Sequence, residues 1–321
     1  MRRRSTPLWW RLGFSILTLV VAVGTLTTTW SATVASHPAY LITLVVVAVG
    51  AVAAGATSLV VRRAAPSDGR LPRRPWLRRA AHGFEILGLL ILLGSLLYLR
   101  PLTASTVAID AMAGTPDVTV TDSATRIELR LTGIARTTGL VFYPGAKVDP
   151  RAYVPNLTPL AAAGYLVIIL KLPYNIAFFD PNGAYRAMDA EPAITRWAVG
   201  GHSLGGVVAS SVAGGTDARV HGLLLWASYP NRSIADQTSL QVTSISGSQD
   251  GLATPAKVDE AKPRLPPDTR YVVIDGGIHS FFGDYGLQSG DGTPSITKEQ
   301  AQVRIQAASL DLLHRVEAGS P

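Results

Sequence analysis

The chain has 321 residues, 47% of them hydrophobic, and its mean hydropathy of +0.25 exceeds that of an ordinary soluble domain. It contains no cysteine, which excludes disulfides, thiolate metal sites and a cysteine nucleophile. The net charge of +7 is unevenly distributed: residues 1–79 hold 11 arginines and one acidic residue, whereas the remainder holds 18 basic and 21 acidic residues. The basic residues therefore flank apolar segments, and the mildly acidic remainder does not support nucleic-acid binding.

Three apolar stretches precede residue 100 and predict transmembrane helices at about residues 12–30, 39–61 and 83–99. The second stretch would form a helix of about 34 Å, enough to cross a hydrocarbon core of about 30 Å. The third has 17 residues and lies near the lower limit. Two alternatives remain: buried core helices, or, for the first stretch, a cleaved signal peptide, although its apolar run exceeds the usual length of about 7–15 residues.

Arginine positions predict the orientation of these helices, because the loops of membrane proteins that carry Lys and Arg stay in the cytoplasm. Eleven arginines precede the first stretch or lie in the loop of residues 62–79, whereas the loop of residues 31–38 has neither Lys nor Arg. Only Arg100 follows the third stretch closely. We therefore expect a multi-pass membrane protein with a cytoplasmic N-terminus, a membrane anchor over residues 1–104 and an extracytoplasmic domain over residues 105–321.

The sequence of the second domain predicts alternating strands and helices. Val118–Thr121 and Arg126–Leu131 alternate apolar and polar residues around Asp122-Ser123, which predicts a β-hairpin. Short apolar runs separated by helix-length segments then predict a mostly parallel sheet with helices on both faces. These runs are Leu140–Tyr143, Leu166–Leu170, Trp197–Gly200, Gly222–Ala227, Val242–Ser246 and Tyr271–Ile274. A last helix begins at Thr297, where Gln300 completes a capping-box pattern, and runs to about Glu317.

Gly201-His202-Ser203-Leu204-Gly205 has the G-x-S-x-G pattern of a nucleophile elbow. In such an elbow the chain leaves a strand, holds the serine in a strained turn and enters a helix at once. Trp197–Gly200 supplies the strand, and the small-residue segment Gly206–Ala213 supplies the helix. This context predicts Ser203 as a nucleophile and disfavours a merely structural glycine turn.

A serine nucleophile needs a histidine base that is oriented by an acid, in the chain order Ser, Asp or Glu, His. Asp250 follows the strand Val242–Ser246, and His279 follows the strand Tyr271–Ile274, so both fall at the same sheet edge as Ser203. Asp250 has an alternative role as a turn former or helix cap. The other histidines have structural contexts: His37, His82, His202, His221 and His314.

An oxyanion hole needs two backbone N–H groups directed at the developing charge. Leu204, the residue after the nucleophile, is expected to supply one. The loop after Leu140–Tyr143 supplies the other; Pro144 has no N–H, so Ala146 is the first choice and Gly145 the second. Asp149-Pro150, just beyond, is typical of a helix N-cap.

Over residues 135–317 the chain resembles the small, cap-less α/β-hydrolases, and more distantly the dienelactone hydrolases. The segments that carry the resemblance are Phe142–Gly145, Gly201–Gly206, Ser248–Gly251 and Gly276–Gly286. The resemblance implies an α/β-hydrolase fold, with Ser203 as nucleophile, Asp250 as acid, His279 as base and an oxyanion hole at residues 145–146. Dienelactone hydrolases use a cysteine nucleophile, so Ser203 departs from them and puts lactone specificity in doubt. The membrane region lies outside the resemblance.

The sequence thus predicts a membrane-anchored serine hydrolase that cleaves a small-molecule or lipid-like acyl ester through an acyl-enzyme. An acyltransferase, a thioesterase or amidase with the same triad, and a non-catalytic membrane scaffold remain as alternatives. No metal motif or dinucleotide fingerprint is present, so no cofactor is expected. Several loop side chains could line an acyl pocket or simply pack: Ile176, Phe178, Phe179, Phe281 and Phe282. Lys147 and Lys171 could attract an anionic substrate, although surface solvation explains them more simply.

Overall fold

A computed structural model describes residues 9–63, 75–133 and 136–319. The chain divides into two compact units. One contains the helices up to Arg100 except for Ala35–Pro38, and the other contains Ala35–Pro38 and the chain from Pro101 onward. The two units are described separately below.

The first unit is helical and comprises α1 (Trp9–Thr28), most of α2 (Trp30–Ala35), α3 (Pro38–Arg63) and α4 (Pro75–Tyr98). Among the described residues, two helical segments are long and apolar enough to cross a membrane, Trp9–Thr28 and Pro38–Leu59. The expectation of about three such helices is therefore corrected to two. In α4 the apolar part is His82–Tyr98, which includes Glu85 and is shorter than those two segments.

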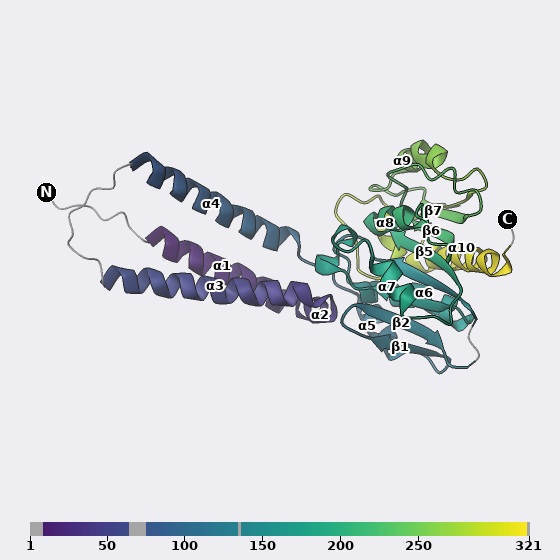
Figure 1. The fold of residues 1–321 in the computed structure, drawn as a ribbon, viewed down its shortest axis with the longest axis horizontal. Helices are drawn as coiled ribbons and strands as arrows, with labels where there is room; N and C mark the ends of the chain where they lie inside the picture. Colours follow the sequence, from purple (N-terminus) through teal and green to yellow (C-terminus); the bar gives the residue numbers. More distant parts are fainter. Residues whose placement is uncertain (1–8, 64–74, 134–135, 320–321) are drawn as a thin grey trace. The chain divides into compact units, whose positions relative to one another are not determined.

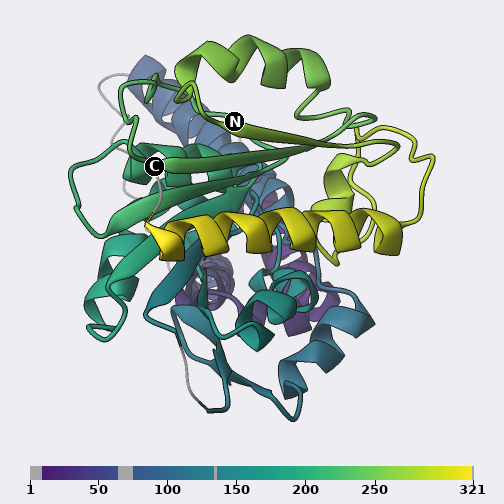
Figure 2. The ribbon, with the colours of Figure 1, turned by 90° about the vertical axis from the view of Figure 1, so that its right-hand side faces the viewer.

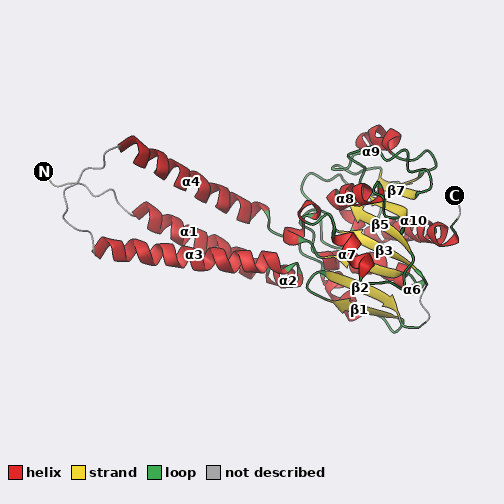
Figure 3. Cartoon of the chain, viewed as in Figure 1, coloured by secondary structure: helices red, strands yellow, loops and turns green. Residues whose placement is uncertain are grey.

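The second unit contains an eight-stranded sheet in the order β1-β2-β4-β3-β5-β6-β7-β8 (Figures 1 and 3). The hairpin β1–β2 is antiparallel, β2 pairs antiparallel with β4, and every later pair is parallel. The mostly parallel sheet and the hairpin predicted from the sequence are thus confirmed. The strands are β1 (Val118–Asp122), β2 (Arg126–Leu131), β3 (Thr138–Tyr143), β4 (Leu166–Leu170), β5 (Arg196–His202), β6 (Val220–Trp226), β7 (Gln241–Gly247) and β8 (Arg270–Ile274).

Helices cover both faces of this sheet, as the apolar character of both faces of its central strands requires. In β3, Leu140 and Phe142 pack with α6 (Val154–Ala162) and α10 (Lys298–Ala318) on one face. Val141 and Tyr143 belong to the opposite core, with α7 (Gly183–Asp189) and α8 (Leu204–Ala213). Figure 2 shows α10 lying across the strands. Thr297 caps α10 in a capping box with Gln300, as predicted.

Short helices fill the connections, and several lie in the loops after strands. The α-helices among them are α5 (Thr106–Asp110) and α9 (Pro255–Ala261). The 3-10 helices are η1 (Ala111–Ala113), η2 (Pro150–Tyr153), η3 (Pro173–Asn175), η4 (Ala177–Phe179), η5 (Lys262–Arg264) and η6 (His279–Phe282). Asp149 caps η2 by accepting from the N–H of Arg151, the N-cap role expected for it. Ligand sites of open parallel sheets lie in the loops at the carboxyl ends of the strands, which directs attention to η2, η3, η4 and η6.

Candidate active site

Ser203 lies in a sharp turn between β5 and α8. Its backbone has φ 53° and ψ −123°, a strained conformation for a residue with a side chain. The turn depends on close backbone contacts: a Cβ on Gly201 would lie 2.4 Å from the carbonyl carbon of Gly205, and one on Gly205 would lie 2.1 Å from the carbonyl oxygen of Tyr143. Only glycine fits at either position, so the predicted elbow geometry is present and Ser203 is half-buried at its apex.

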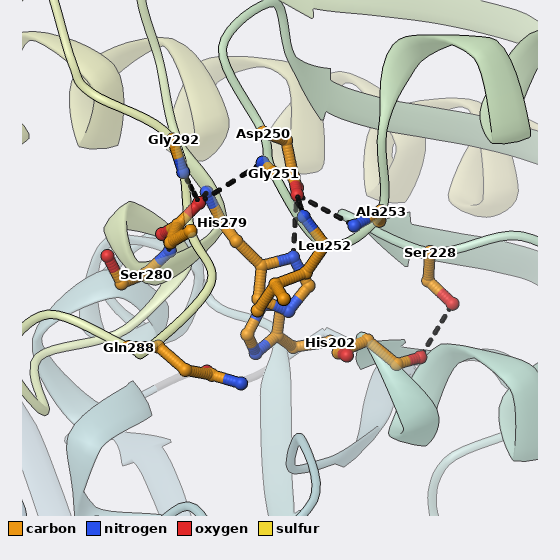
Figure 4. A network of polar contacts seen from close by, with 12 residues as sticks. His202, Ser228, Asp250, Gly251, Leu252, Ala253, His279, Ser280, Gln288 and Gly292 are labelled. Atoms are coloured by element: carbon orange, nitrogen blue, oxygen red, sulfur yellow. Dashed lines mark hydrogen bonds and ion pairs between the residues drawn. The ribbon is translucent and has the colours of Figure 1, made fainter.

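Asp250 and His279 meet at the same edge of the sheet. Asp250 Oδ2 lies 2.9 Å from His279 Nδ1, and both side chains are buried (Figure 4). The other oxygen of Asp250 accepts from the backbone N–H of Leu252 at 2.8 Å and of Ala253 at 2.7 Å. An ionised carboxylate only accepts, so it holds the proton on Nδ1 and leaves the lone pair of Nε2 available. This is the arrangement that a general base requires.

His279 lies beside the elbow. The His279 ring is 4.5 Å, centroid to centroid, from the ring of His202, the residue before Ser203. In the part of the chain that the structure describes, no hydrogen bond joins the Ser203 hydroxyl to His279. In enzymes without bound substrate this contact is often long, and it tightens when substrate binds.

Two backbone N–H groups face the elbow from different loops. Leu204 is the first residue of α8, and its N–H is one of the donors that a helix start leaves unpaired. The N–H of Gly145 is engaged by the hydroxyl of Tyr153 at 2.8 Å, whereas that of Ala146 has no hydrogen-bond partner among the described residues. The structure therefore favours Ala146 over Gly145 as the second donor to an oxyanion.

A comparison with protein-family models identifies the family of the chain. A family model described as the alpha/beta hydrolase family matches residues 139–303, just over half of the chain. The chain belongs to the alpha/beta hydrolase family. The match begins in β3 and extends into α10, so it includes the elbow and the loops of Asp250 and His279.

Solved structures with similarity to this hydrolase include an alpha-beta serine hydrolase homologue from Coxiella burnetii. It is 15% identical, with a TM-score of 0.42, over 63% of this chain and 98% of that one. A dienelactone hydrolase-like protein from Klebsiella pneumoniae is 16% identical, with a TM-score of 0.47, over 59% and 92% of the two chains. Mouse alpha/beta hydrolase domain-containing protein 10 is 14% identical, with a TM-score of 0.43, over 62% and 98%. No curated protein matches the chain significantly in sequence.

Asp291 is a residue of the site that the sequence analysis missed. Its carboxylate accepts from the backbone N–H of Gly251 at 3.3 Å, in the loop of Asp250, and from those of His279 at 3.0 Å and Ser280 at 2.8 Å. A fourth bond comes from Gly292 at 2.7 Å. One carboxylate thus joins the loop that carries the acid to the loop that carries the base. In sequence, Asp291 stands between two glycines and looks like an ordinary turn residue.

The electrostatics of Asp291 favour its charged form. Partial burial raises the pKa of this carboxyl, but the hydrogen bonds from the backbone of Ser280, Gly292 and His279 outweigh burial and lower the pKa below its usual value. Asp291 is therefore ionised at neutral pH, and each of its bonds to an N–H is charge-assisted.

His202 is fully buried below the elbow, as the packing role predicted for it requires. Its ring stacks on Phe282 at 5.8 Å, and its Nδ1 lies 2.9 Å from the hydroxyl of Tyr153. Burial and the neighbouring His279 lower the pKa of His202 well below its ordinary value, so the ring is neutral and Nδ1 accepts from Tyr153. Since Tyr153 also accepts from Gly145, His202 holds the loop that presents the Ala146 N–H.

Other expected side chains have simpler roles. Lys171 is buried in an ion pair with Asp122 at 2.5 Å, so the expectation that it is a solvated surface residue is wrong. Phe281 and Phe282 pack in the core, whereas Phe178 and Phe179 are exposed. Among the described residues no group of three or more His, Cys, Asp or Glu side chains is placed to hold a metal ion.

Replacing Asp291 by Asn should impair catalysis while the fold is retained. The amide offers one acceptor and a donor where four N–H groups converge, so the acid and base loops should shift relative to each other. We expect kcat to fall by about 10–100-fold, the cost of a misplacement of about 1 Å, with KM little changed. Steady-state kinetics on a soluble ester measures both parameters.

The matched control is Asp275→Asn. Asp275 also connects the two loops, but only through the Ser248 hydroxyl at 3.1 Å, and it is exposed. Equal losses of kcat in the two variants would contradict the role of Asp291.

The free energy of unfolding should also depend on pH. The difference in this free energy between the Asp291→Asn variant and the unsubstituted chain should be full above the unfolded carboxyl pKa of about 4, and it should vanish as pH falls through the lowered folded pKa of Asp291.

Proposed function

We propose that the chain is a membrane-anchored serine hydrolase that cleaves acyl esters through an acyl-enzyme. The observation that carries the proposal is the buried hydrogen bond between His279 and Asp250 beside the strained turn of Ser203. A serine hydroxyl is a poor nucleophile at neutral pH, and this pair supplies the base that it lacks. The free N–H groups of Ala146 and Leu204 add the second requirement, stabilisation of an oxyanion.

In the proposed reaction Ser203 Oγ bonds to the ester carbonyl carbon as its proton passes to His279 Nε2. The carbonyl oxygen becomes an oxyanion that accepts from the N–H groups of Ala146 and Leu204. Collapse of this intermediate breaks the bond to the alcohol, which takes the proton from His279 and leaves the acyl group on Ser203. Water then attacks the acyl-enzyme, gives its proton to His279 and releases the carboxylic acid as Ser203 regains its hydrogen.

Three alternative functions make different demands on the same residues. An acyltransferase would use an alcohol instead of water in the second half of the reaction, and a thioesterase or amidase would differ only in the leaving group. A non-catalytic scaffold would have no need for the buried contact between Asp250 and His279. Burying both polar side chains is costly unless they are hydrogen-bonded to each other, and a catalyst has a use for that arrangement.

Ser203→Ala should abolish both ester hydrolysis and labelling by a fluorophosphonate probe, which reacts only with an activated serine. His279→Ala should do nearly the same, and Asp250→Asn should lower kcat by about 10⁴-fold, as loss of the orienting acid does in serine proteases. Because the three act as a unit, combining the changes should cost little more than one alone. Full labelling of Ser203→Ala would exclude Ser203 as the nucleophile.

We further propose that α1 and α3 cross the membrane, that α4 crosses it again with its shorter apolar segment His82–Tyr98, and that the N-terminus and residues 62–79 are cytoplasmic. The support is the concentration of arginine on these flanks and its near absence on the opposite ones. The hydrolase unit then works on the outer side, on a small-molecule or lipid-like ester. The apolar segments Trp9–Thr28 and Pro38–Leu59 are long enough for two of the crossings.

A membrane-impermeant protease added to cells with permeable outer layers tests this orientation. The unit from Pro101 onward should be lost while the loop of residues 62–79 stays intact. Survival of the hydrolase unit until the inner membrane is lysed would reverse the orientation and direct the substrate search to cytoplasmic esters.

A further inference from the structure

The loop between β4 and α7 exposes two adjacent aromatic side chains. Phe178 and Phe179, in η4, are 53% and 59% exposed. In the loop after η6, which follows β8 at the carboxyl edge of the sheet, Leu287 is 77% exposed. These three large apolar side chains lie on loops at the same edge of the sheet. An exposed apolar patch of this kind marks a surface that binds an apolar partner.

These side chains border the candidate active site. The η4 segment contacts α8, which begins at Leu204, and the N–H of Lys147 donates to the carbonyl of Asn175 at 2.8 Å. The aromatic loop is thus bonded directly to the loop that presents the Ala146 N–H. Leu287 precedes Gln288, whose side-chain carbonyl accepts from the hydroxyl of Tyr285 at 3.2 Å, and the Tyr285 ring lies 6.2 Å from the ring of His202.

The chain enters the hydrolase unit at the same place. Leu102 forms a β-bridge with Val148, its N–H donates to the carbonyl of Lys147 at 2.7 Å, and its own carbonyl accepts from Asp149 at 2.9 Å. The last apolar helix, α4, ends at Tyr98. Four residues of extended chain reach at most about 14 Å, so a bilayer that holds α4 lies close to the active-site edge of the sheet.

We propose that this edge docks on the surface of the bilayer through Phe178, Phe179 and Leu287, and that the enzyme takes its acyl ester from the membrane lipid rather than from water. Aromatic side chains favour the membrane interface, and a bilayer is the apolar partner that the covalent link to α4 keeps within reach. The inference rests on the proposed hydrolase function for its substrate, but the docking itself is independent of catalysis.

The absence of native cysteine allows a direct test in the full-length chain. Single variants Phe178→Cys and Leu287→Cys carry a nitroxide label in nanodiscs of phosphatidylcholine and phosphatidylglycerol. The control is Ala318→Cys at the end of α10, where Arg196 of β5 donates to the carbonyl of Val316 at 2.6 Å, at the opposite edge of the sheet. Labels at 178 and 287 should collide more with oxygen, which enters the bilayer, than with a water-soluble nickel complex. The same ratio of collisions at all three positions would overturn the docking.

Catalysis gives a second readout. Replacing Phe178 and Phe179 together by Ser should lower hydrolysis of a long-chain ester embedded in vesicles by about tenfold or more, because the interface loses two aromatic anchors. Hydrolysis of water-soluble p-nitrophenyl acetate should not change, and the exposed control His314→Ser should affect neither rate. The inference would be overturned if the double variant hydrolysed the embedded ester as fast as the unsubstituted chain does, or if it lost the same fraction of its rate on both substrates. Failure of the unsubstituted chain to cleave p-nitrophenyl acetate would instead contradict the proposed function, and the label collisions would still decide the docking.

Discussion

The backbone at Gly205 lies against the end of β3, and the rest of the site depends on that close approach. A side chain at Gly205 would overlap the carbonyl of Tyr143, so only glycine lets α8 start directly under the loop that follows β3. This contact brings the start of α8, with the Leu204 N–H, close to the loop that carries the Ala146 N–H. It also requires the positive φ of Ser203, which raises the serine side chain above the carboxyl edge of the sheet. The strain is offset by the packing of α8 on β5 and β6.

Two buried hydrogen-bond networks hold the other loops of the site in position beside this turn. On one side, Tyr153 accepts from Gly145 and donates to the neutral ring of His202, which stabilises the oxyanion loop from below. On the other, Asp291 collects four N–H groups and joins the loop of Asp250 to that of His279. Such networks specify one geometry because each polar group left unpaired in a buried site would be costly.

Local patterns in the sequence were sufficient to predict much of this fold. Period-two alternation identified the hairpin, apolar runs identified the parallel strands, and Thr297 with Gln300 identified the start of α10. Asp250 and His279 were predicted to meet because parallel strands end at one edge, and the structure brings them within 2.9 Å. Their catalytic roles remain proposals.

Features that depend on contacts between distant segments were not predictable in this way. Asp291 acts on Gly251, forty residues away, and nothing in its own neighbourhood distinguishes it from a turn residue. In the sequence Lys171 looks like a solvated surface lysine, but in the structure it forms an ion pair with Asp122 of the β1–β2 hairpin. The third apolar stretch already lay near the lower limit of a span in the sequence, and in α4 the apolar segment His82–Tyr98 is no longer than that stretch.

The exposed aromatic side chains of η4 support the proposal that the active-site edge of the sheet faces the bilayer. The point where the chain enters the hydrolase unit supports the same orientation. The proposed chemistry requires that Ser203 becomes acylated. The most direct measurement is mass spectrometry of the full-length protein quenched in acid during turnover of a slowly hydrolysed ester. The account predicts a mass increase equal to the acyl group, located on the peptide that contains Ser203. Turnover without such an adduct, or an adduct on another residue, would contradict it.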